Sequence, residues 1–514
     1  MGKGWGTILA AAAVVVAGCA PSPDLRPQPT PSDTVPGTTA PSATDSPSAP
    51  AEPEPVVPAP PLEAAELATY GGVATLVVSA GCTGTLIETG VDTAPAYLLT
   101  NGHCVGVDGM SANDTLIDSE GQGEVRFFNV AGGAEKVLSV PVTRFEYGTM
   151  RGVDVGIVRV DSTLGELRAA GAVPLKIASE APAEGTQVVN IASPTQGVAA
   201  DQQVLRKGEC TLGATVDLIE HKWLWLDAPR TDCPGVLGGS SGSPMIADGE
   251  IVSIINTTNT GVPADRGASC YLGKPCEITA DGAEFVPNSS YGVDIAGMGA
   301  CFPDGTFALG DDCPLAAGSL SRVGGGGIYG ADGTDGGDRP AELTLEAGGA
   351  QAVAVVQGVP LKDARTCTDP ATYDSAPMMT LEDGVEIAST PVTLPTANGF
   401  VLACAAEPGN EEAAARFVYS VDTVAPTEGP KLSQTPLGED ELMIDPLFDI
   451  PDIADIHLVF GPVDETDCSD RSSYFPYRRQ PLFFAPEDLP ARFCAVGFDM
   501  AGNESPVTDQ IVER

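Results

Sequence analysis

The stretch RGVDVGIVRV, Arg151 to Val160, shows the pattern on which the fold prediction depends. Its apolar part, VGIVRV, is short, rich in β-branched residues and preceded by Asp. Runs of four to eight such residues, separated by Gly, Asp, Asn or Pro, are typical of β-strands. The pattern recurs in ATLVVSA, AYLLT, EVRFFNV, QVVNIA and EIVSIINT. The sequence therefore predicts an all-β barrel or sandwich and not a helical or βαβ protein.

Length and charge indicate how many domains the chain can form and which partners it can bind. A chain of 514 residues is long enough for about three domains. Acidic residues outnumber basic ones by 70 to 26, which gives a net charge of −44. Such a charge repels phosphate backbones and anionic headgroups, so we expect no nucleic-acid partner. A surface kept soluble is the simple explanation of the charge, and attraction to a basic partner is the alternative.

The first 19 residues have the pattern of an export signal. Lys3 is followed by the apolar run ILAAAAVVVAG, which is too short to span a bilayer comfortably. The run ends in VAGC, Val16 to Cys19, which resembles the lipobox of bacterial lipoproteins. That resemblance implies an acylated Cys19, a membrane anchor and a place in the cell envelope, with Ala20 favouring the outer membrane or cell surface. An ordinary secretory signal with a chance cysteine is the alternative.

Cysteine usage agrees with export. Without Cys19, twelve of the thirteen cysteines remain, an even number in an exported chain. These twelve cysteines fall into six pairs of neighbours along the sequence. This predicts six local disulfides, although sequence alone does not prove the connectivity. The predicted pairs are Cys82 with Cys104, Cys210 with Cys233, Cys270 with Cys276, Cys301 with Cys313, Cys367 with Cys404, and Cys468 with Cys494. Zinc is the rival explanation, but the chain has no CxxC and only three histidines. We therefore predict no metal and no cofactor.

Composition also divides the chain into segments. A Pro/Ser/Thr-rich stretch with few large apolar residues predicts a tether. A Gly-rich stretch, Gly324 to Pro340, indicates a second boundary. The predicted segments are a signal with its lipidated Cys (1–19), a disordered tether (20–61), a β-barrel domain (62–316), a linker (317–340) and two repeats (341–424 and 425–514).

The two repeats are inferred from an internal similarity. TCTDPATY, Thr366 to Tyr373, returns 101 residues later as DCSDRSSY, Asp467 to Tyr474. Each copy has one Cys in a polar turn and a second in a predicted strand. Two β-sandwich modules fit this spacing. The segment FCAVGFDMAGNES also resembles the last strand of bacterial immunoglobulin-like or fibronectin type III-like repeats.

The segment GGSSGSP, Gly238 to Pro244, is a candidate nucleophile turn. A serine hydroxyl needs a base within hydrogen-bond reach and a carboxylate that orients the base. His103 follows an apolar strand and lies next to Cys104, whereas His221, in IEHKWLWLD, has the pattern of a surface strand. Asp154 leads the apolar run quoted above and is the candidate carboxylate.

Together these motifs resemble the trypsin/chymotrypsin-like serine peptidases, in the family's order of His, Asp and Ser. The matching segments are TNGHC, DVGIV and GSSGSP. The resemblance covers about half of the chain. It implies a double β-barrel, a catalytic triad of His103, Asp154 and Ser241, and an oxyanion hole formed by the N–H groups of Gly239 and Ser241. The substrate would pair with the strand around three further residues, Asn256, Thr257 and Thr258.

The sequence also departs from the animal digestive members of this family. Ser240 stands where they carry an Asp that pairs with a freshly cut N-terminus, so we expect a domain that needs no activating cut. Asn101 stands where Ala is usual, which suggests a bacterial branch. The pocket acid of trypsin would fall at Gly235, with Asp232 close by, and the uncharged strand favours neutral P1 side chains.

Three interpretations of function follow from these residues. The first is a surface-tethered serine endopeptidase that acts on exported proteins or peptides. The second is a catalytically silent, peptidase-like adhesion or scaffold lipoprotein that binds the cell envelope or other proteins. The third, compatible with the first, gives a binding role to the C-terminal repeats. The sequence does not indicate an oligomeric state.

Overall fold

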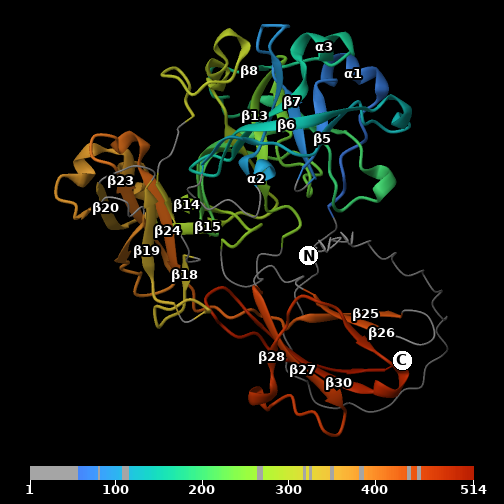
Figure 1. Cartoon of the computed structure of the whole chain (residues 1–514), viewed down its shortest axis with the longest axis vertical. Helices are drawn as coiled ribbons and strands as arrows, with labels where there is room; N and C mark the ends of the chain where they lie inside the picture. The colour runs from blue at the N-terminus through green and yellow to red at the C-terminus, as the bar shows by residue number, and fades with distance from the viewer. Residues whose placement is uncertain are drawn as a thin grey trace, which may run out of the picture. The chain divides into compact units, whose positions relative to one another are not determined.

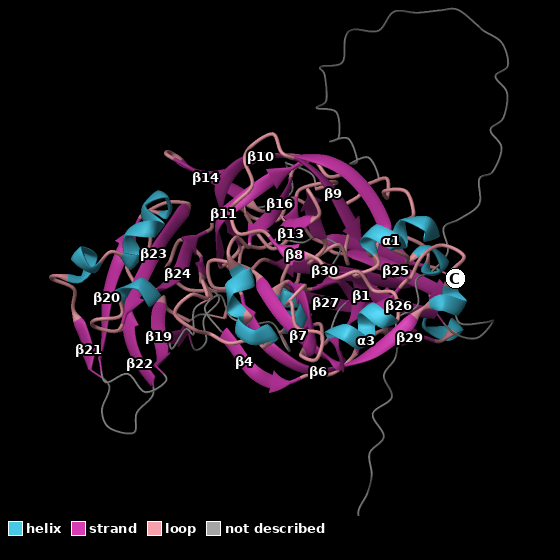
Figure 2. Ribbon diagram, turned by 90° about the horizontal axis from the view of Figure 1, so that it is seen from above, coloured by secondary structure: helices cyan, strands magenta, loops and turns pink. Residues whose placement is uncertain are grey.

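The computed structural model describes residues 56–78, 81–106, 115–262, 270–315, 320–322, 327–337, 339–347, 352–380, 387–436, 442–447 and 453–513. Strands predominate over helices in this part of the chain (Figure 2). The predicted all-β fold class is therefore confirmed. Three short α-helices are α1 (Leu67–Tyr70), α2 (Gly102–Val105) and α3 (Leu164–Ala169). None of the described helices has the length and apolar character needed to cross a bilayer.

Six strands close into a first barrel, in the order β6-β5-β1-β2-β3-β7 and back to β6. Strand β4 adds to β6 at the outside of this ring. The seven strands are β1 (Val73–Val77), β2 (Gly81–Leu86), β3 (Pro95–Thr100), β4 (Thr115–Glu120), β5 (Glu124–Phe127), β6 (Leu138–Thr149) and β7 (Val155–Thr163). Strand β7 is the VGIVRV run, and its first four residues are fully buried. Closure pairs the ends of the sheet and so leaves no open edge in this barrel.

A second barrel closes in the same way, in the order β10-β11-β16-β13-β12-β9 and back to β10. The hairpin β14–β15 extends from β10, and β8 pairs with β13. These strands are β8 (Lys176–Ile177), β9 (Gln187–Ala192), β10 (Arg206–Glu220), β11 (Trp223–Thr231), β12 (Pro244–Ala247), β13 (Glu250–Thr258), β14 (Cys276–Thr279), β15 (Gly282–Phe285) and β16 (Ser290–Asp294).

One hydrophobic core joins the two barrels. Side chains of β3 and β7, such as Leu99 and Ile157, pack in the same cluster as Ile191 of β9 and Ile254 of β13. A second cluster fills the first barrel and a third fills the second. Because apolar side chains from both barrels meet between them, the loops that leave the two barrels at this junction are held against each other. The candidate catalytic motifs lie on these loops.

The described C-terminal strands, yellow to red in Figure 1, form four sheets. Two sheets share one core, in which Leu345 of β19 packs with Phe417 of β24. The other two share a second core, in which Ile444 of β26 packs with Phe493 of β30. The strands are β17 (Leu320–Arg322), β18 (Ile328–Tyr329), β19 (Glu342–Ala347), β20 (Ala352–Val359), β21 (Met378–Thr380), β22 (Ile387–Pro391), β23 (Gly399–Ala406), β24 (Ala415–Val421), β25 (Lys431–Pro436), β26 (Leu442–Leu447), β27 (Asp455–Pro462), β28 (Phe475–Pro476), β29 (Leu482–Phe484), β30 (Ala491–Phe498) and β31 (Thr508–Val512).

The similarity between residues 366–373 and 467–474 has a structural counterpart. In the first segment the Tyr373 hydroxyl donates a hydrogen bond to the Cys367 carbonyl oxygen at 2.7 Å. In the second, the Tyr474 hydroxyl donates to the Cys468 carbonyl oxygen at 2.9 Å. Each of these cysteines is bonded to a cysteine in a following strand, β23 or β30. The two copies therefore each use a tyrosine at the equivalent position to close an equivalent turn.

All six predicted disulfide pairs are present in the structure. The bonds join Cys82 to Cys104, Cys210 to Cys233, Cys270 to Cys276, Cys301 to Cys313, Cys367 to Cys404, and Cys468 to Cys494. Their surroundings differ: Cys404 is completely buried on β23, whereas Cys313 is only partly buried in the segment that follows β16. Disulfides of this number indicate an oxidising, exported environment.

The last residues of the predicted tether, 56–61, lie within the described part of the chain. Cys19, the predicted lipidation site, lies outside the described residues. Residues 56–61 contact the second barrel, because Pro60 accepts a hydrogen bond from the Lys207 N–H and Pro61 forms a β-bridge with Arg206. The described residues thus include six that precede the boundary expected at residue 62, and part of this stretch pairs with the second barrel.

Candidate active site

His103 and Asp154 are joined by two hydrogen bonds. His103 lies on α2, one turn of helix directly after β3, and Asp154 directly precedes β7, the neighbour of β3 in the sheet. The backbone N–H of His103 donates to Asp154 Oδ1 at 3.0 Å, and His103 Nδ1 lies 2.6 Å from Asp154 Oδ2. The Asp154 side chain is fully buried, while that of His103 is 33% exposed. The carboxylate therefore fixes the ring and leaves Nε2 as the nitrogen that can act on a substrate or nucleophile.

The electrostatics of this pair favour the protonated ring. Burial opposes the charge and lowers the pKa of His103, but the charge of Asp154 and its hydrogen bond to Nδ1 act in the opposite direction. The charge of Glu220 adds to their effect. The pKa of His103 is consequently raised above its usual value. An imidazole of this kind is a stronger base, which suits proton abstraction from a hydroxyl.

Asn101 forms a further hydrogen bond between the histidine turn and Asp154. Its side chain is completely buried, and its Nδ2 donates to the Asp154 backbone carbonyl at 2.8 Å. Asn101 also precedes α2, so the same residue begins the helical turn that carries His103. The departure from Ala noted in the sequence thus has a local reason. Asn101 adds a hydrogen bond that holds the two motifs together.

The serine turn is held by Thr83 of β2. The N–H of Thr83 donates to the Ser241 carbonyl at 2.8 Å, and its hydroxyl donates to the Gly239 carbonyl at 2.9 Å. Neighbouring Cys82 is bonded to Cys104, which adjoins His103. One short segment of β2 therefore contacts both the histidine turn and the serine turn. No hydrogen bond joins Ser241 Oγ to the His103 ring in the described structure, and such contacts commonly tighten only when substrate binds.

Gly239 has a backbone conformation that favours glycine, with φ of 99°. The Gly238 carbonyl accepts hydrogen bonds from the N–H groups of Thr195 at 2.8 Å and Gln196 at 3.0 Å. Since the carbonyl and N–H of a trans peptide point in opposite directions, the Gly239 N–H points away from these residues. Within the described part of the chain, neither this N–H nor that of Ser241 donates a hydrogen bond. Two such N–H groups are what an oxyanion hole requires.

The segment Asn256–Thr258 ends β13 next to the serine turn. Residue 255 connects the two, because the Gly242 N–H donates to the Ile255 carbonyl and the Ile255 N–H donates to the Ser243 carbonyl, both at 2.9 Å. Thr258 Oγ1 lies 2.8 Å from Ser290 Oγ and donates to Thr260 Oγ1 at 3.0 Å. This places an uncharged, hydroxyl-lined wall beside the turn.

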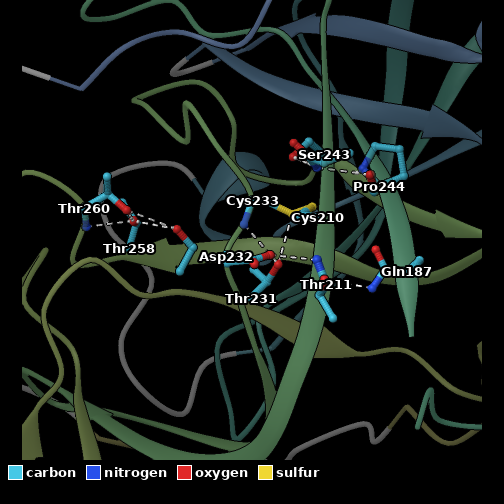
Figure 3. Close-up of a disulfide and its surroundings, with 12 residues drawn as sticks. Gln187, Cys210, Thr211, Thr231, Asp232, Cys233, Ser243, Pro244, Thr258 and Thr260 are labelled. Atoms are coloured by element: carbon cyan, nitrogen blue, oxygen red, sulfur yellow. Dashed lines mark hydrogen bonds between the residues drawn. A yellow bond between two sulfur atoms is a disulfide. The ribbon is translucent and has the colours of Figure 1, made fainter. Parts of the chain in front are cut away.

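Figure 3 shows the disulfide Cys210–Cys233, which fixes the start of the loop that carries the serine turn. Asp232, the residue before Cys233, is exposed, and its Oδ1 accepts a hydrogen bond from the Thr211 N–H at 2.7 Å. Its carboxylate is thus bound to the backbone of β10. Gly235, which has no side chain, occupies the position six residues before Ser241.

Two further residues correct or extend the sequence analysis. His221 was expected on a surface strand, but it is buried in the turn between β10 and β11, where its φ is 56° and its ring lies 5.4 Å from that of Trp223. Glu220, which the sequence analysis missed, ends β10 as a buried carboxylate. It accepts hydrogen bonds from Trp225 Nε1 at 3.1 Å and from the Gly273 N–H at 2.7 Å. Burial raises the pKa of Glu220.

Among the described residues, two groups of side chains are close enough to share a metal ion, and one of them includes His103. Both groups contain two cysteines that are already joined in a disulfide, Cys82–Cys104 or Cys468–Cys494. A disulfide offers no thiolate, so these groups do not have the ligands of a zinc site.

Comparison with known families agrees with this arrangement. The model of the trypsin-like peptidase domain matches residues 82–254, about a third of the chain. The chain contains a trypsin-like peptidase domain. All three candidate triad residues, His103, Asp154 and Ser241, fall within the matched range. No curated protein matches the chain.

Several solved structures resemble part of this chain. One is an inactive mutant form of Rv3671c from M. tuberculosis H37Rv, with 18% identity, coverage of 47% of this chain and 91% of the other, and a TM-score of 0.27. Another is the thermostable serine protease AL20 from an extremophilic microorganism, with 16% identity, coverage of 45% and 94%, and a TM-score of 0.28. A third is neuropsin from mouse brain, with 14% identity, coverage of 44% and 91%, and a TM-score of 0.27.

Proposed function

We propose that the trypsin-like peptidase domain is an active serine endopeptidase that hydrolyses peptide bonds of exported proteins. The observation that carries the proposal is the doubly hydrogen-bonded pair of His103 and buried Asp154. The disulfide Cys82–Cys104 joins the histidine turn to the β2 segment whose Thr83 holds the Ser241 turn. These contacts support a triad of His103, Asp154 and Ser241, the groups that acyl transfer needs.

In the proposed reaction, Ser241 Oγ attacks the carbonyl carbon of the scissile peptide while His103 Nε2 takes the hydroxyl proton. The N–H groups of Gly239 and Ser241 stabilise the resulting oxyanion, at about 3–4 kcal/mol per donor. His103 then gives the proton to the leaving amine as the C–N bond breaks, which leaves an acyl-enzyme. Water, deprotonated by the same nitrogen, releases the acid and restores Ser241. Asp154 stays ionised and stabilises the imidazolium.

The environment of the substrate fits neutral side chains. Thr258 and Ser290 present hydroxyl groups, and Gly235 presents no side chain. The one acid nearby in the sequence, Asp232, is bound to the β10 backbone. We therefore propose a P1 preference for uncharged residues over Lys or Arg. The predicted substrate-binding segment Asn256–Thr258 would pair with the substrate backbone.

The rest of the chain supplies the location. We propose that residues 1–19 are a lipoprotein signal, that acylated Cys19 anchors the protein in the cell envelope, and that the C-terminal sheets are two immunoglobulin-like repeats. The six disulfides support an exported location. They do not depend on the anchor, so loss of lipidation would change where the peptidase acts and not whether it acts.

The test is proteolysis by the full, oxidised chain. Wild type and Ser241→Ala are incubated with an unfolded protein, and the new peptide termini are identified by mass spectrometry. Ser162→Ala, at the end of β7, serves as the matched control. Cleavage by wild type and the control, but not by Ser241→Ala, is expected. Equal activity, or equal lack of it, in folded wild type and Ser241→Ala would overturn the proposal and favour the silent scaffold lipoprotein.

A further inference from the structure

The segment Val56–Leu62, VVPAPPL, forms a brace that lies against the second barrel. Its backbone pairs with the start of β10. The Leu62 N–H donates to the Leu205 carbonyl at 2.8 Å, and the Lys207 N–H donates to the Pro60 carbonyl at 2.9 Å. Three of its seven residues are prolines, which hold the backbone extended and reduce the entropy lost when the segment is ordered.

A buried arginine fixes the middle of the brace. Arg206 is only 6% exposed, and its Nη1 donates to the Ala59 carbonyl at 2.7 Å. Its Nη2 donates to the Gln202 carbonyl at 3.0 Å. A buried guanidinium is costly without acceptors, so the position of the Ala59 carbonyl is strongly favoured. Ala59 itself is 7% exposed, which leaves little room for a larger side chain.

The brace contacts the loop that carries Ser241. Gly235 belongs to this loop, and its φ is 67°. A Cβ placed on Gly235 would lie 2.2 Å from the Ala59 nitrogen and 2.9 Å from the Pro58 carbonyl carbon. The two backbones therefore touch directly, and any displacement of Ala59 removes the support behind Gly235.

The brace also contacts the segment that follows β13. A Cβ on Gly261 would lie 2.8 Å from Val56 Cγ2. Gly261 comes three residues after Thr258, the end of the proposed substrate-binding segment. One continuous stretch of chain therefore supports two loops, one with the nucleophile and one beside the substrate wall.

We propose that the brace is a positioning element that holds these two loops in the reactive arrangement, so that the uncut chain is the active form. This inference rests on the proposed peptidase function. Where a peptidase of this kind uses a newly formed N-terminus, this chain would use an internal segment whose backbone is bound by Arg206. Ser240 agrees with this arrangement, because it is fully buried and its hydroxyl accepts from the Leu237 N–H at 3.1 Å, which needs no positive partner.

The experiment displaces the brace in the full chain. Ala59→Leu places a larger side chain at a buried site, and Arg206→Gln removes the guanidinium that binds the Ala59 carbonyl. Val57→Leu is the matched control, because Val57 belongs to the same segment and is 79% exposed. The first readout is the rate at which a fluorophosphonate labels Ser241. The second is amide hydrogen exchange of residues 233–243, with β1–β3 as the internal reference for folding.

We expect Ala59→Leu and Arg206→Gln to slow labelling, by about 10²-fold where the reacting atoms shift by about 1 Å. Exchange of residues 233–243 should become faster while exchange of β1–β3 stays unchanged, and Val57→Leu should match wild type in both readouts. Wild-type labelling and wild-type exchange in both variants would overturn the proposed positioning role of the brace. Absence of labelling in folded wild type would instead overturn the peptidase function, and the exchange data alone would then decide whether the brace orders the loop.

Discussion

Replacing Asp154 by Asn changes the orientation of His103 with little change in shape. In the native protein Asp154 accepts two hydrogen bonds, from the His103 N–H and from Nδ1. Asn can keep the first through its carbonyl oxygen. Its amide N–H₂ would face Nδ1, so the ring proton would move to Nε2, the nitrogen that has to accept the proton of Ser241. The substitution therefore produces the wrong tautomer in an otherwise folded site.

The expected loss can be estimated from these contacts. A hydrogen bond to a charged group contributes about 1.5–3 kcal/mol, and the tautomer accounts for the rest. The total expected for the orienting aspartate of a serine peptidase is about 10⁴-fold in kcat, or about 5 kcal/mol in activation free energy. The pKa of His103 should also fall, since the carboxylate is one of the groups that raise it.

The assay is kcat/KM for a peptide substrate as a function of pH. Activity requires the neutral ring, so the rate rises as the pH increases through the pKa of His103. In wild type this acid limb should lie above the ordinary histidine value of 6.5. Asp154→Asn should lower the plateau and move the limb to lower pH, whereas Asp161→Asn, at the exposed end of the same strand, should change neither. A variant with the wild-type plateau and limb would refute the role of Asp154.

Three further predictions concern residues around the pair. Thr83→Val removes the hydroxyl that bonds the serine turn, so it should lower kcat by at least about tenfold and the free energy of unfolding by about 1–3 kcal/mol. Thr85 is the matched control, because it is also fully buried on β2 but its hydroxyl has no hydrogen-bond partner. Thr85→Val should therefore be neutral or stabilising in urea unfolding. Glu220→Gln removes a charge that raises the pKa of His103, so the acid limb of the pH–rate profile should move to lower pH; an unmoved limb would contradict this coupling. Asn101→Ala should cost about 1–3 kcal/mol and lower kcat with little change in KM; a loss of stability without loss of kcat would make Asn101 merely structural.

Much of the fold could be predicted from local sequence. The β-branched runs between turn residues predict the strands, since each run is long enough for one strand and too short for a helix. The disulfide partners are neighbours along the chain and therefore lie on adjacent or directly connected elements. The order of the motifs around His103, Asp154 and Ser241 indicated the site, because each motif places its residue at the end of a strand or in a tight turn.

Other features depend on contacts between distant residues and have no local signal. Glu220 is one of 70 acids in the sequence, and only the β10–β11 hairpin brings its charge near His103. The prolines of residues 56–61 have the composition of a tether, and their position on the barrel follows from pairing with Arg206 and its neighbours. His221 looked like a surface residue because the turn that buries it forms only when β10 pairs with β11.

The most direct test of the central claim is to locate the adduct that a fluorophosphonate forms with the folded, oxidised chain. Peptide mass spectrometry distinguishes the three serines of GGSSGSP. We expect a single adduct on Ser241, formed fastest above the pKa of His103 and abolished in His103→Ala. An adduct on Ser240 or Ser243, or no adduct on a folded chain, would contradict the assignment of Ser241 as an activated nucleophile.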